Sequence, residues 1–343
     1  MDPNKEVARM RVVVIGGCGH IGTYLVPRLV GAGHDVVVLS RGRQAPYLAH
    51  GAWSSVQRLQ VDRAAEEQAG TFGRRLQALH PDALIDLICF EPQSARLLVE
   101  SLRGAIGHLL LCGTIWVHGP SAVVPTTEDQ PRRPFDEYGR KKAEIETYLL
   151  HEAHQTGFPA TILHPGHIVG PGWAPVNPAG HLNPQVFAVL ARGQDLALPN
   201  LGLETVHHVH ADDVARIFVK AMQSRGVALG ESFHVVSPAA LTLRGYAEAV
   251  AGWFGQPARL RFLPWEEWRG TVSPEEAEAT WSHIAHSPNC SIAKAQRLLD
   301  FRPRYSSLEA VYEAVQSLIA RQVIDVPPLS MLAAESTETL RTN

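Results

Sequence analysis

The sequence has no apolar run that approaches the roughly 18 to 20 residues needed to cross a membrane as a helix. It also lacks a basic excess, because 31 lysines and arginines are outnumbered by 34 aspartates and glutamates, for a formal net charge of -3. Proteins that bind nucleic acid usually carry a clear positive excess. We therefore expect a small-molecule substrate, and neither a membrane nor a nucleic acid as a partner.

Cysteine is scarce as well, with four residues in 343 and no C-x-x-C pair. Cys89 and Cys112 lie in or beside apolar runs and are expected to be small buried side chains. The first ten residues, MDPNKEVARM, hold no apolar core of the signal-peptide type. These features favour a reducing, cytoplasmic location.

The first 165 residues alternate short β-branched runs with helical patterns. Strands are expected at 12–15, 36–39, 56–61, 83–88, 108–112 and 161–163, and helices at 23–32, 94–103 and 138–153. Such alternation implies right-handed crossovers and a parallel sheet covered by helices on both faces. The predicted fold class is therefore α/β, with a Rossmann-type doubly wound parallel sheet.

The character of the chain changes after residue 165, where proline and glycine crowd into residues 165–184. A long irregular stretch of this kind is more often a binding loop than a linker. Further helices are expected at 213–223, 292–299 and 308–321, and a strand at 233–236. We predict a dinucleotide-binding domain over 1–165, a smaller substrate-binding lobe over 166–330 that is partly interleaved with the sheet, and a flexible tail over 331–343.

A glycine-rich segment, GGCGHIG, follows the first expected strand directly and opens the first expected helix. Gly16 allows a tight turn, Gly19 lets the backbone approach a pyrophosphate, and Gly22 permits close packing of the helix on the strand. The helix N-terminus then offers unpaired N–H groups to phosphates. A glycine-rich turn without a ligand is the alternative. The residues expected to contact the cofactor here are Gly16, Gly19, His20, Ile21 and Gly22.

The end of the second expected strand indicates which dinucleotide is bound. An acidic residue there would accept hydrogen bonds from the adenosine ribose, but this chain has Ser40 and Arg41. A hydroxyl and a guanidinium suit a 2′-phosphate, so NADP is favoured, with NAD as the second choice. Alternatively, Arg41 stacks on the adenine.

Tyr138 and Lys142 lie four residues apart, on one face of an expected helix. A tyrosine with a pKa near 10 exchanges protons poorly at neutral pH, and a neighbouring ammonium group favours the phenolate. By chance, a Tyr-x-x-x-Lys spacing is expected only ~0.1 times in a chain of this composition. Thr114, just past the fifth expected strand, can hold a substrate oxygen through its hydroxyl. The alternative is that Tyr138 and Lys142 form an ordinary pair of side chains on a helix surface.

These segments together resemble the extended short-chain dehydrogenase/reductases, also called the NAD-dependent epimerase/dehydratase family. The likeness rests on GGCGHIG, the Thr114 segment, YGRKK, PGHIVGPG, HHVHADDVARIF and LLDFRPRYSSLEAV, and covers nearly the whole chain. It implies a triad of Thr114, Tyr138 as acid/base, and Lys142 as its electrostatic partner and nicotinamide-ribose ligand. It also implies Asp62 near the adenine, and Pro165 to His167 near the nicotinamide.

The chain departs from two branches of that family. Its dehydratases carry Thr-Asp-Glu where this chain has Thr114, Ile115 and Trp116, so the second proton carrier of an elimination is missing. Its sugar-nucleotide epimerases place asparagine where His167 stands, and a diphosphate-binding arginine where we count Val206. Arginines elsewhere are candidates to replace that group: Arg192, Arg244 and Arg269.

Two side-chain groups allow more than one interpretation. Trp173, Trp265 and Trp268 can line a site for a sugar ring or a flat small molecule, or can belong to the core. The histidines at 207, 208 and 210 are plausible metal ligands, but strand alternation separates neighbours, and Asp212 is expected to cap the next helix with Asp213 in its first turn. We therefore expect no metal.

The predicted function is NAD(P)-dependent oxidoreduction or epimerisation of a secondary alcohol or ketone, which can be sugar-like, with Tyr138 as the acid/base. The alternative is a nucleotide-sugar 4-epimerase. A further alternative, from a different functional class, is a non-catalytic member of the fold that senses dinucleotides or binds RNA. Such members tend to lose the tyrosine or the lysine, and both are present here. A homodimer or a monomer is expected.

Overall fold

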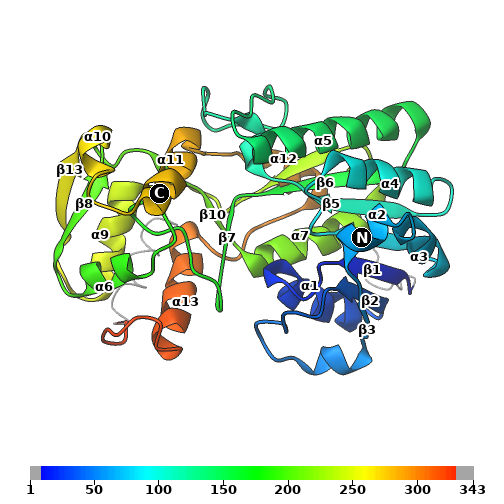
Figure 1. Ribbon diagram of the computed structural model, residues 1–343, viewed down its shortest axis with the longest axis horizontal. Helices are drawn as coiled ribbons and strands as arrows, with labels where there is room; N and C mark the ends of the chain where they lie inside the picture. The colour runs from blue at the N-terminus through cyan, green and yellow to red at the C-terminus, as the bar shows by residue number, and fades with distance from the viewer. Residues whose placement is uncertain (1–8, 330–343) are drawn as a thin grey trace.

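The computed structural model describes residues 9–329, and its centre is a seven-stranded sheet with the order β11-β6-β5-β4-β1-β2-β3 (Figure 1). Every pairing within this sheet is parallel. The strands are β1 (Arg11–Ile15), β2 (Asp35–Ser40), β3 (Gln57–Gln60), β4 (Ala83–Asp86), β5 (His108–Cys112), β6 (Ala160–Pro165) and β11 (Ser232–Val235). The Rossmann-type parallel sheet predicted from the sequence is confirmed.

Helices cover both faces of this sheet, as a sheet of continuous apolar strands requires. One face packs against α1 (His20–Gly31), α7 (Ala211–Gln223) and α12 (Ala293–Leu299). The other packs against α3 (Phe72–Ala78), α4 (Pro92–Leu102) and α5 (Glu137–Thr156). The neighbouring strands β1 and β4 are buried along most of their length, so the apolar runs in the sequence do lie between two helical layers.

A smaller lobe has its own apolar core and lies beside the sheet domain (Figure 1). It contains α6 (Gln185–Ala191), β8 (Asp195–Pro199), α9 (Leu243–Trp253), β13 (Arg259–Leu263), α10 (Trp265–Trp268), α11 (Pro274–His286) and α13 (Ser307–Ala320). The chain crosses between the two parts more than once, because α7, β11 and α12 return to the sheet. The exact domain boundaries stay a prediction, and residues 331–343 lie outside the described part.

Short elements connect these layers. They are η1 (Gly51–Ser55), α2 (Arg63–Gln68), η2 (Ile115–His118), β7 (His167–Val169), β9 (Thr205–Val206), β10 (His208–His210), α8 (Arg225–Ala228) and β12 (Leu241–Thr242). The parallel pair of β7 and β10 lies between the sheet domain and the lobe. Within residues 9–329 no helix is both long and apolar enough to span a membrane.

Element boundaries differ from the predicted ones by a few residues at most ends. The first helix begins at His20, three residues earlier than expected, because its first turn is built from the glycine-rich segment and shows no apolar period. The helix that carries Tyr138 runs on to Thr156 and ends where Gly157 adopts a left-handed conformation with φ 71°. The segment that begins at Pro274 forms the 13-residue helix α11, which was not among the helices expected from the sequence.

Candidate active site

The glycine-rich segment forms the turn between β1 and α1. Gly16 has a φ of 81°, a conformation that favours glycine, and a Cβ there would lie 2.8 Å from Ile88 Cγ2. A Cβ at Gly22 would lie 2.0 Å from the carbonyl oxygen of Gly17, so this glycine allows the helix to approach the loop rather than a strand. Beside Gly19 there is open space apart from one loop carbonyl, as an approaching phosphate requires.

Two adjoining cavities follow the carboxyl ends of the strands from this turn. One has a volume of about 670 Å³ and lies over β2 and α2, and the other, of about 480 Å³, lies over β5 and β6. Both are lined by Gly16, Gly19, Gln44, Ile88 and Phe90, so they form one groove with the phosphate-binding turn at its middle. A dinucleotide has the same order of parts: a base, a central pyrophosphate and a second base. The residues present therefore fit such a cofactor.

The larger cavity is rich in guanidinium groups. Arg41 and Arg43 line it, are exposed, and have no ion-pair partner among residues 9–329. Ser40 also lines it, and its hydroxyl accepts the N–H of Gly42 at 3.4 Å. Asp62 lines the same cavity while its carboxylate caps α2 by accepting the N–H of Ala65 at 3.3 Å. Two free cations next to a hydroxyl form a site for an anion.

A third arginine in that cavity is held in place by carboxylates. Arg63 donates to the fully buried carboxylate of Asp86 at 2.8 Å and to Glu67 at 2.6 Å. Burial alone would lower the pKa of Arg63, but the neighbouring carboxylates outweigh it and raise this pKa. Arg63 is therefore neutralised locally and is less free than Arg41 to bind a phosphate.

The predicted triad converges at the smaller cavity. Thr114, Tyr138 and Lys142 all line it, although Thr114 follows β5 while the other two lie on α5. The Lys142 ammonium is buried and donates to the carbonyl oxygens of Cys89 and Cys112, each at 2.8 Å. Its nitrogen lies 5.8 Å from the centre of the Tyr138 ring. An ammonium has three N–H donors, so one remains for a ligand in the cavity.

The Tyr138 phenol is not activated by the protein alone. Burial raises its pKa, the neighbouring Cys112 adds to this, and a hydrogen bond with the Thr114 hydroxyl lowers it in part. Burial also lowers the pKa of Lys142. The sequence prediction attributed an acidified phenol to the Lys142 ammonium, and in the protein without cofactor the effect of burial on the pKa of Tyr138 is the larger one.

Sequence reasoning placed Pro165 and His167 near the nicotinamide, and both line the smaller cavity beside Thr114 and Tyr138. The Nε2 atom of His167 is buried and has no hydrogen-bond partner in the described part of the chain. His283, from α11, lines the cavity too, with its ring centre 5.1 Å from that of His167. Of these two rings, His167 has a buried nitrogen without a partner, whereas Nδ1 of His283 is hydrogen-bonded to the carbonyl oxygen of Gly180 at 2.8 Å.

His20 and Ile21 line the cavity at the start of α1. Both ring nitrogens of His20 are buried without a hydrogen-bond partner among the described residues, and the ring stacks on Trp173 with centres 5.0 Å apart. Burial lowers the pKa of His20 to about 3, so this ring is neutral. Contact of these two residues with the cofactor stays a prediction.

Sequence reasoning missed two residues of the cavity region. His283 comes from α11, and Trp116 stands between the Tyr138 ring, 6.0 Å away, and the His283 ring, 5.5 Å away. The serine and glutamate at 273 and 276 form a capping box around the start of α11, and this Ser-x-x-Glu spacing could have identified the helix. No comparable local signal marks Trp116.

The arginines considered as diphosphate ligands do not line the cavity. Arg192 donates to the carbonyl oxygen of Asp325, Arg244 pairs with Glu248, and Arg269 pairs with Glu266. Val206, which stands where the epimerases carry arginine, is fully buried in the lobe core. The only charged side chain among the described residues that line the smaller cavity is that of Lys142.

The three tryptophans have different environments. Trp268 is fully buried in the lobe core and donates its indole N–H to the carbonyl oxygen of Ala197. Trp265 is partly buried and stacks on Trp268. Trp173 is 42% exposed and lines the cavity. Only Trp173 therefore supports an aromatic wall for a substrate.

The histidine and aspartate cluster is part of the structure between domain and lobe. Within residues 9–329 no group of three or more metal-ligating side chains is arranged to hold an ion. The prediction that Asp212 caps α7 is wrong, because the imidazole of His210 accepts the N–H of Asp212 and occupies the capping position. Asp212 instead pairs with Arg28, and Asp213, in the first turn as predicted, accepts the N–H groups of Arg304 and Tyr305.

Comparison with known proteins agrees with this geometry. Residues 12–235 match the model of the NAD dependent epimerase/dehydratase family. A 2'-dehydrokanamycin reductase from Streptomyces kanamyceticus is 27% identical over 272 residues, or 77% of this chain and 72% of that protein. A UDP-glucose 4-epimerase from Mycolicibacterium smegmatis is 26% identical over 330 residues, covering 90% of this chain and 98% of that one.

A solved structure shares the fold across both parts of the molecule. The crystal structure of a putative epimerase from Burkholderia cenocepacia superposes with a TM-score of 0.71 at 22% identity, covering 92% of this chain and 99% of that one. The fold, the phosphate-binding turn and the matched residues lead to one conclusion. This chain belongs to the NAD dependent epimerase/dehydratase family, whose members are enzymes of the oxidoreductase or epimerase type that use a nicotinamide dinucleotide.

Proposed function

We propose that this protein reduces a ketone, or oxidises the corresponding secondary alcohol, on a sugar-like ring that carries no phosphate, with NADP(H) as the cofactor. The observation that carries the proposal is the charge of the smaller cavity. Its described lining has neutral imidazoles, aromatic rings and hydroxyls around one ammonium that is already held by two carbonyl oxygens. A diphosphate in this cavity would lack a guanidinium partner.

The proposed chemistry uses three side chains. The bound cofactor supplies or accepts the hydride. Tyr138 gives its phenolic proton to the carbonyl oxygen during reduction and takes a proton during oxidation. Thr114 holds the same oxygen through its hydroxyl, and Lys142 directs its remaining N–H to the nicotinamide ribose and stabilises negative charge on the phenolate.

The lobe supplies the rest of the recognition. His167 Nε2 offers a hydrogen bond to a ring hydroxyl, while Trp173 provides a flat apolar surface for the carbon face of a sugar. Buried polar atoms without partners discriminate strongly, because a ligand that leaves them unpaired is bound poorly. A ring bearing several hydroxyls fits this pattern better than a simple ketone.

The preference for NADP rests on the larger cavity. Arg41 and Arg43 are free of ion pairs in the described structure and stand beside the Ser40 hydroxyl. At the end of β2, where a carboxylate would bind the adenosine ribose and repel a 2′-phosphate, this chain has Ser40. The family description names NAD, whereas the proposal of NADP rests on Ser40, Arg41 and Arg43 of this chain.

A nucleotide-sugar 4-epimerase remains the second candidate, because relatives with that name align over most of the chain. The two candidates differ in net redox change. We expect NADPH to be consumed with 2'-dehydrokanamycin, a phosphate-free keto sugar, and no change with UDP-glucose. Interconversion of UDP-glucose and UDP-galactose without net change in the nicotinamide would overturn the proposal in favour of the epimerase.

A further inference from the structure

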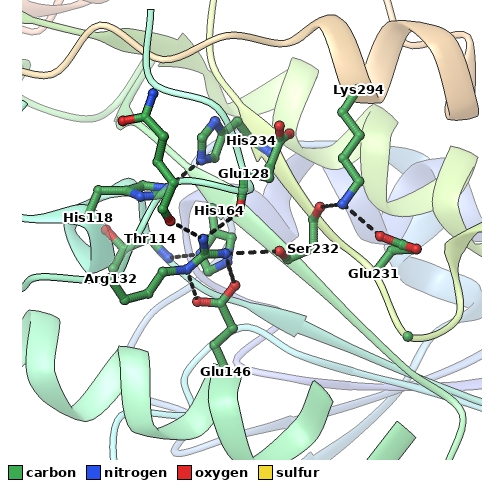
Figure 2. A network of polar contacts seen from close by, with 12 residues as sticks. Thr114, His118, Glu128, Arg132, Glu146, His164, Glu231, Ser232, His234 and Lys294 are labelled. Atoms are coloured by element: carbon green, nitrogen blue, oxygen red, sulfur yellow. Dashed lines mark hydrogen bonds and ion pairs between the residues drawn. The ribbon is translucent and has the colours of Figure 1, made fainter. Parts of the chain in front are cut away.

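A buried row of polar side chains lies directly behind Thr114. It runs from Thr114 through His164 on β6 and Glu146 on α5 to Arg132, in the loop before α5 (Figure 2). His164 and Glu146 are almost completely buried. His164, Glu146 and Arg132 do not line the described cavities, so the proposed chemistry gives these three side chains no role.

The hydrogen bonds fix the state of the His164 ring. The backbone N–H of Thr114 donates to His164 Nδ1 at 2.9 Å, and a backbone amide can only donate. The ring proton therefore sits on Nε2, which donates to the Glu146 carboxylate at 3.0 Å. His164 is thus a neutral acceptor for Thr114, in a tautomer that is set by Glu146.

Glu146 is fixed from its other side by Arg132. The guanidinium donates to both carboxylate oxygens, at 2.9 and 2.5 Å, and also to the backbone carbonyl oxygens of Glu128 and Gln130 (Figure 2). Burial would raise the pKa of Glu146, but the guanidinium charge of Arg132 and the hydrogen bonds donated by Arg132 and His164 lower this pKa. The carboxylate is therefore ionised, and it stands one helical turn beyond Lys142 on the same helix.

The backbone of the preceding residue is shaped for this contact. A Cβ added to Gly113 would lie 2.3 Å from His164 Nδ1 and 2.6 Å from the neighbouring ring carbon. Only a glycine lets the His164 ring come close enough to accept the N–H of Thr114. The close approach is an observation independent of the hydrogen bonds.

Thr114 is consequently held both at its backbone and at its side chain. Its N–H is fixed by His164, and its side-chain oxygen accepts the N–H of Trp116 at 3.3 Å. With the oxygen lone pair used in this way, the hydroxyl proton is left for Tyr138 or for a substrate oxygen.

We propose that His164 is a positioning residue for the reaction: held by Glu146 and Arg132, it fixes the Thr114 backbone so that the Thr114 hydroxyl faces Tyr138. The inference rests on the proposed function. Through His164 and Glu146, Thr114, which follows β5, is linked to α5, the helix that carries Tyr138 and Lys142. A mere structural role for the buried ion pair would not require the Thr114 contact.

Two substitutions separate the two contacts of the ring. His164→Asn keeps an oxygen at the position of Nδ1, so it can still accept from Thr114, but it cannot reach Glu146 with a donor. His164→Gln keeps a donor near the position of Nε2 for Glu146 and loses the acceptor for Thr114. Both variants retain the Arg132–Glu146 pair, and their thermal stability and NADPH affinity are measured first as controls for folding.

With NADPH and 2'-dehydrokanamycin as the probe, we expect kcat to fall about 10- to 100-fold in His164→Gln with KM and the NADPH Kd within about threefold. His164→Asn should recover most of kcat. Amide hydrogen exchange of the peptide containing Thr114 should be faster in His164→Gln alone. Equal kcat and equal exchange in the two variants would overturn the inference.

The Tyr138→Phe variant distinguishes this failure from a failure of the proposed function. If Tyr138→Phe loses turnover while both His164 variants match the wild type, the positioning role is wrong and the proposed function stands. If Tyr138→Phe turns over normally, the proposed function itself is wrong. If the wild type does not reduce the probe, the amide exchange of Thr114 still decides whether His164 fixes this backbone.

Discussion

The two cavities that meet at the phosphate-binding turn differ in their charged groups. The larger one carries three guanidinium groups, two of them without ion-pair partners in the described structure, together with the carboxylates of Asp62, Glu67 and Glu91. The smaller one has no guanidinium in its described lining and presents imidazole, hydroxyl and aromatic groups around Lys142. In the proposed function the unpaired guanidinium groups lie at the adenosine end of the cofactor and the substrate end has none, so substrates that carry phosphate are disfavoured.

The largest effect is expected at the substrate end, from Tyr138→Phe. Removal of the phenolic oxygen eliminates the proton donor while the ring continues to contact Trp116. We expect turnover of the ketone probe to fall by about 10³-fold or more. The NADPH Kd, measured by fluorescence titration, should stay within about twofold. Turnover at the wild-type level would remove Tyr138 from the chemistry.

The neutral histidines predict a strong dependence of stability on pH. Burial lowers the pKa of His207 to about 4 and that of His208 to about 3, whereas both have values near 6.5 in an unfolded chain. Below pH 6.5 the unfolded state therefore binds protons that the folded state does not. The free energy of unfolding should fall as the pH drops from about 6.5 towards 4, by up to about 1.4 kcal/mol per pH unit for each such ring.

Urea titrations between pH 5 and pH 8 measure this dependence. The predicted result is a plateau above about pH 7 and a steep loss of the free energy of unfolding below pH 6.5. A flat profile between pH 7 and pH 5 would show that these rings are not buried in their neutral form.

At the adenosine end, Arg41→Ala tests the anion site. Loss of a guanidinium that bonds a 2′-phosphate should weaken NADPH about 10- to 100-fold and leave the NADH Kd nearly unchanged. Arg58→Ala is a matched control, because Arg58 on β3 is exposed and lines neither cavity. Equal weakening of both cofactors would mean that Arg41 contacts a part that they share, such as the adenine.

The smallest effect is expected from adding a charge to the neutral cavity. Leu182 is 50% exposed and lines the smaller cavity, so Leu182→Arg places a guanidinium near its entrance. We expect a threefold to tenfold gain, on the order of 1 kcal/mol, in affinity for UDP in the presence of NADP, detected by calorimetry. Leu201→Arg, at a position that is 65% exposed and lies outside the cavity, should show no gain. Tight UDP binding by the wild type would contradict the neutral-cavity account.

The sheet could be predicted from the sequence because its strands are buried on both faces and therefore appear as continuous apolar runs. The phosphate-binding turn could be predicted because three glycines stand at set distances between a strand and a helix. Tyr138, Lys142 and Thr114 could be predicted to meet because the ends of parallel strands share one edge.

The rest of the site depends on contacts between distant segments. His164 lies in an apolar strand, where a histidine looks like an ordinary core residue, and its partner Glu146 is 18 positions away on another element. His283 reaches the cavity from α11, and the backbone of Gly113 matters only because the His164 ring packs on it. The cap of α7 was misassigned because His210 competes successfully with Asp212 for that position.

The contrast in charge is tested most directly by calorimetric titration of the NADP-saturated protein with 2'-dehydrokanamycin and with UDP-glucose at low and moderate ionic strength. We expect saturable binding of the phosphate-free sugar and no binding of UDP-glucose at the same concentrations. Micromolar binding of UDP-glucose that weakens as salt is added would show a cationic substrate site and contradict the account.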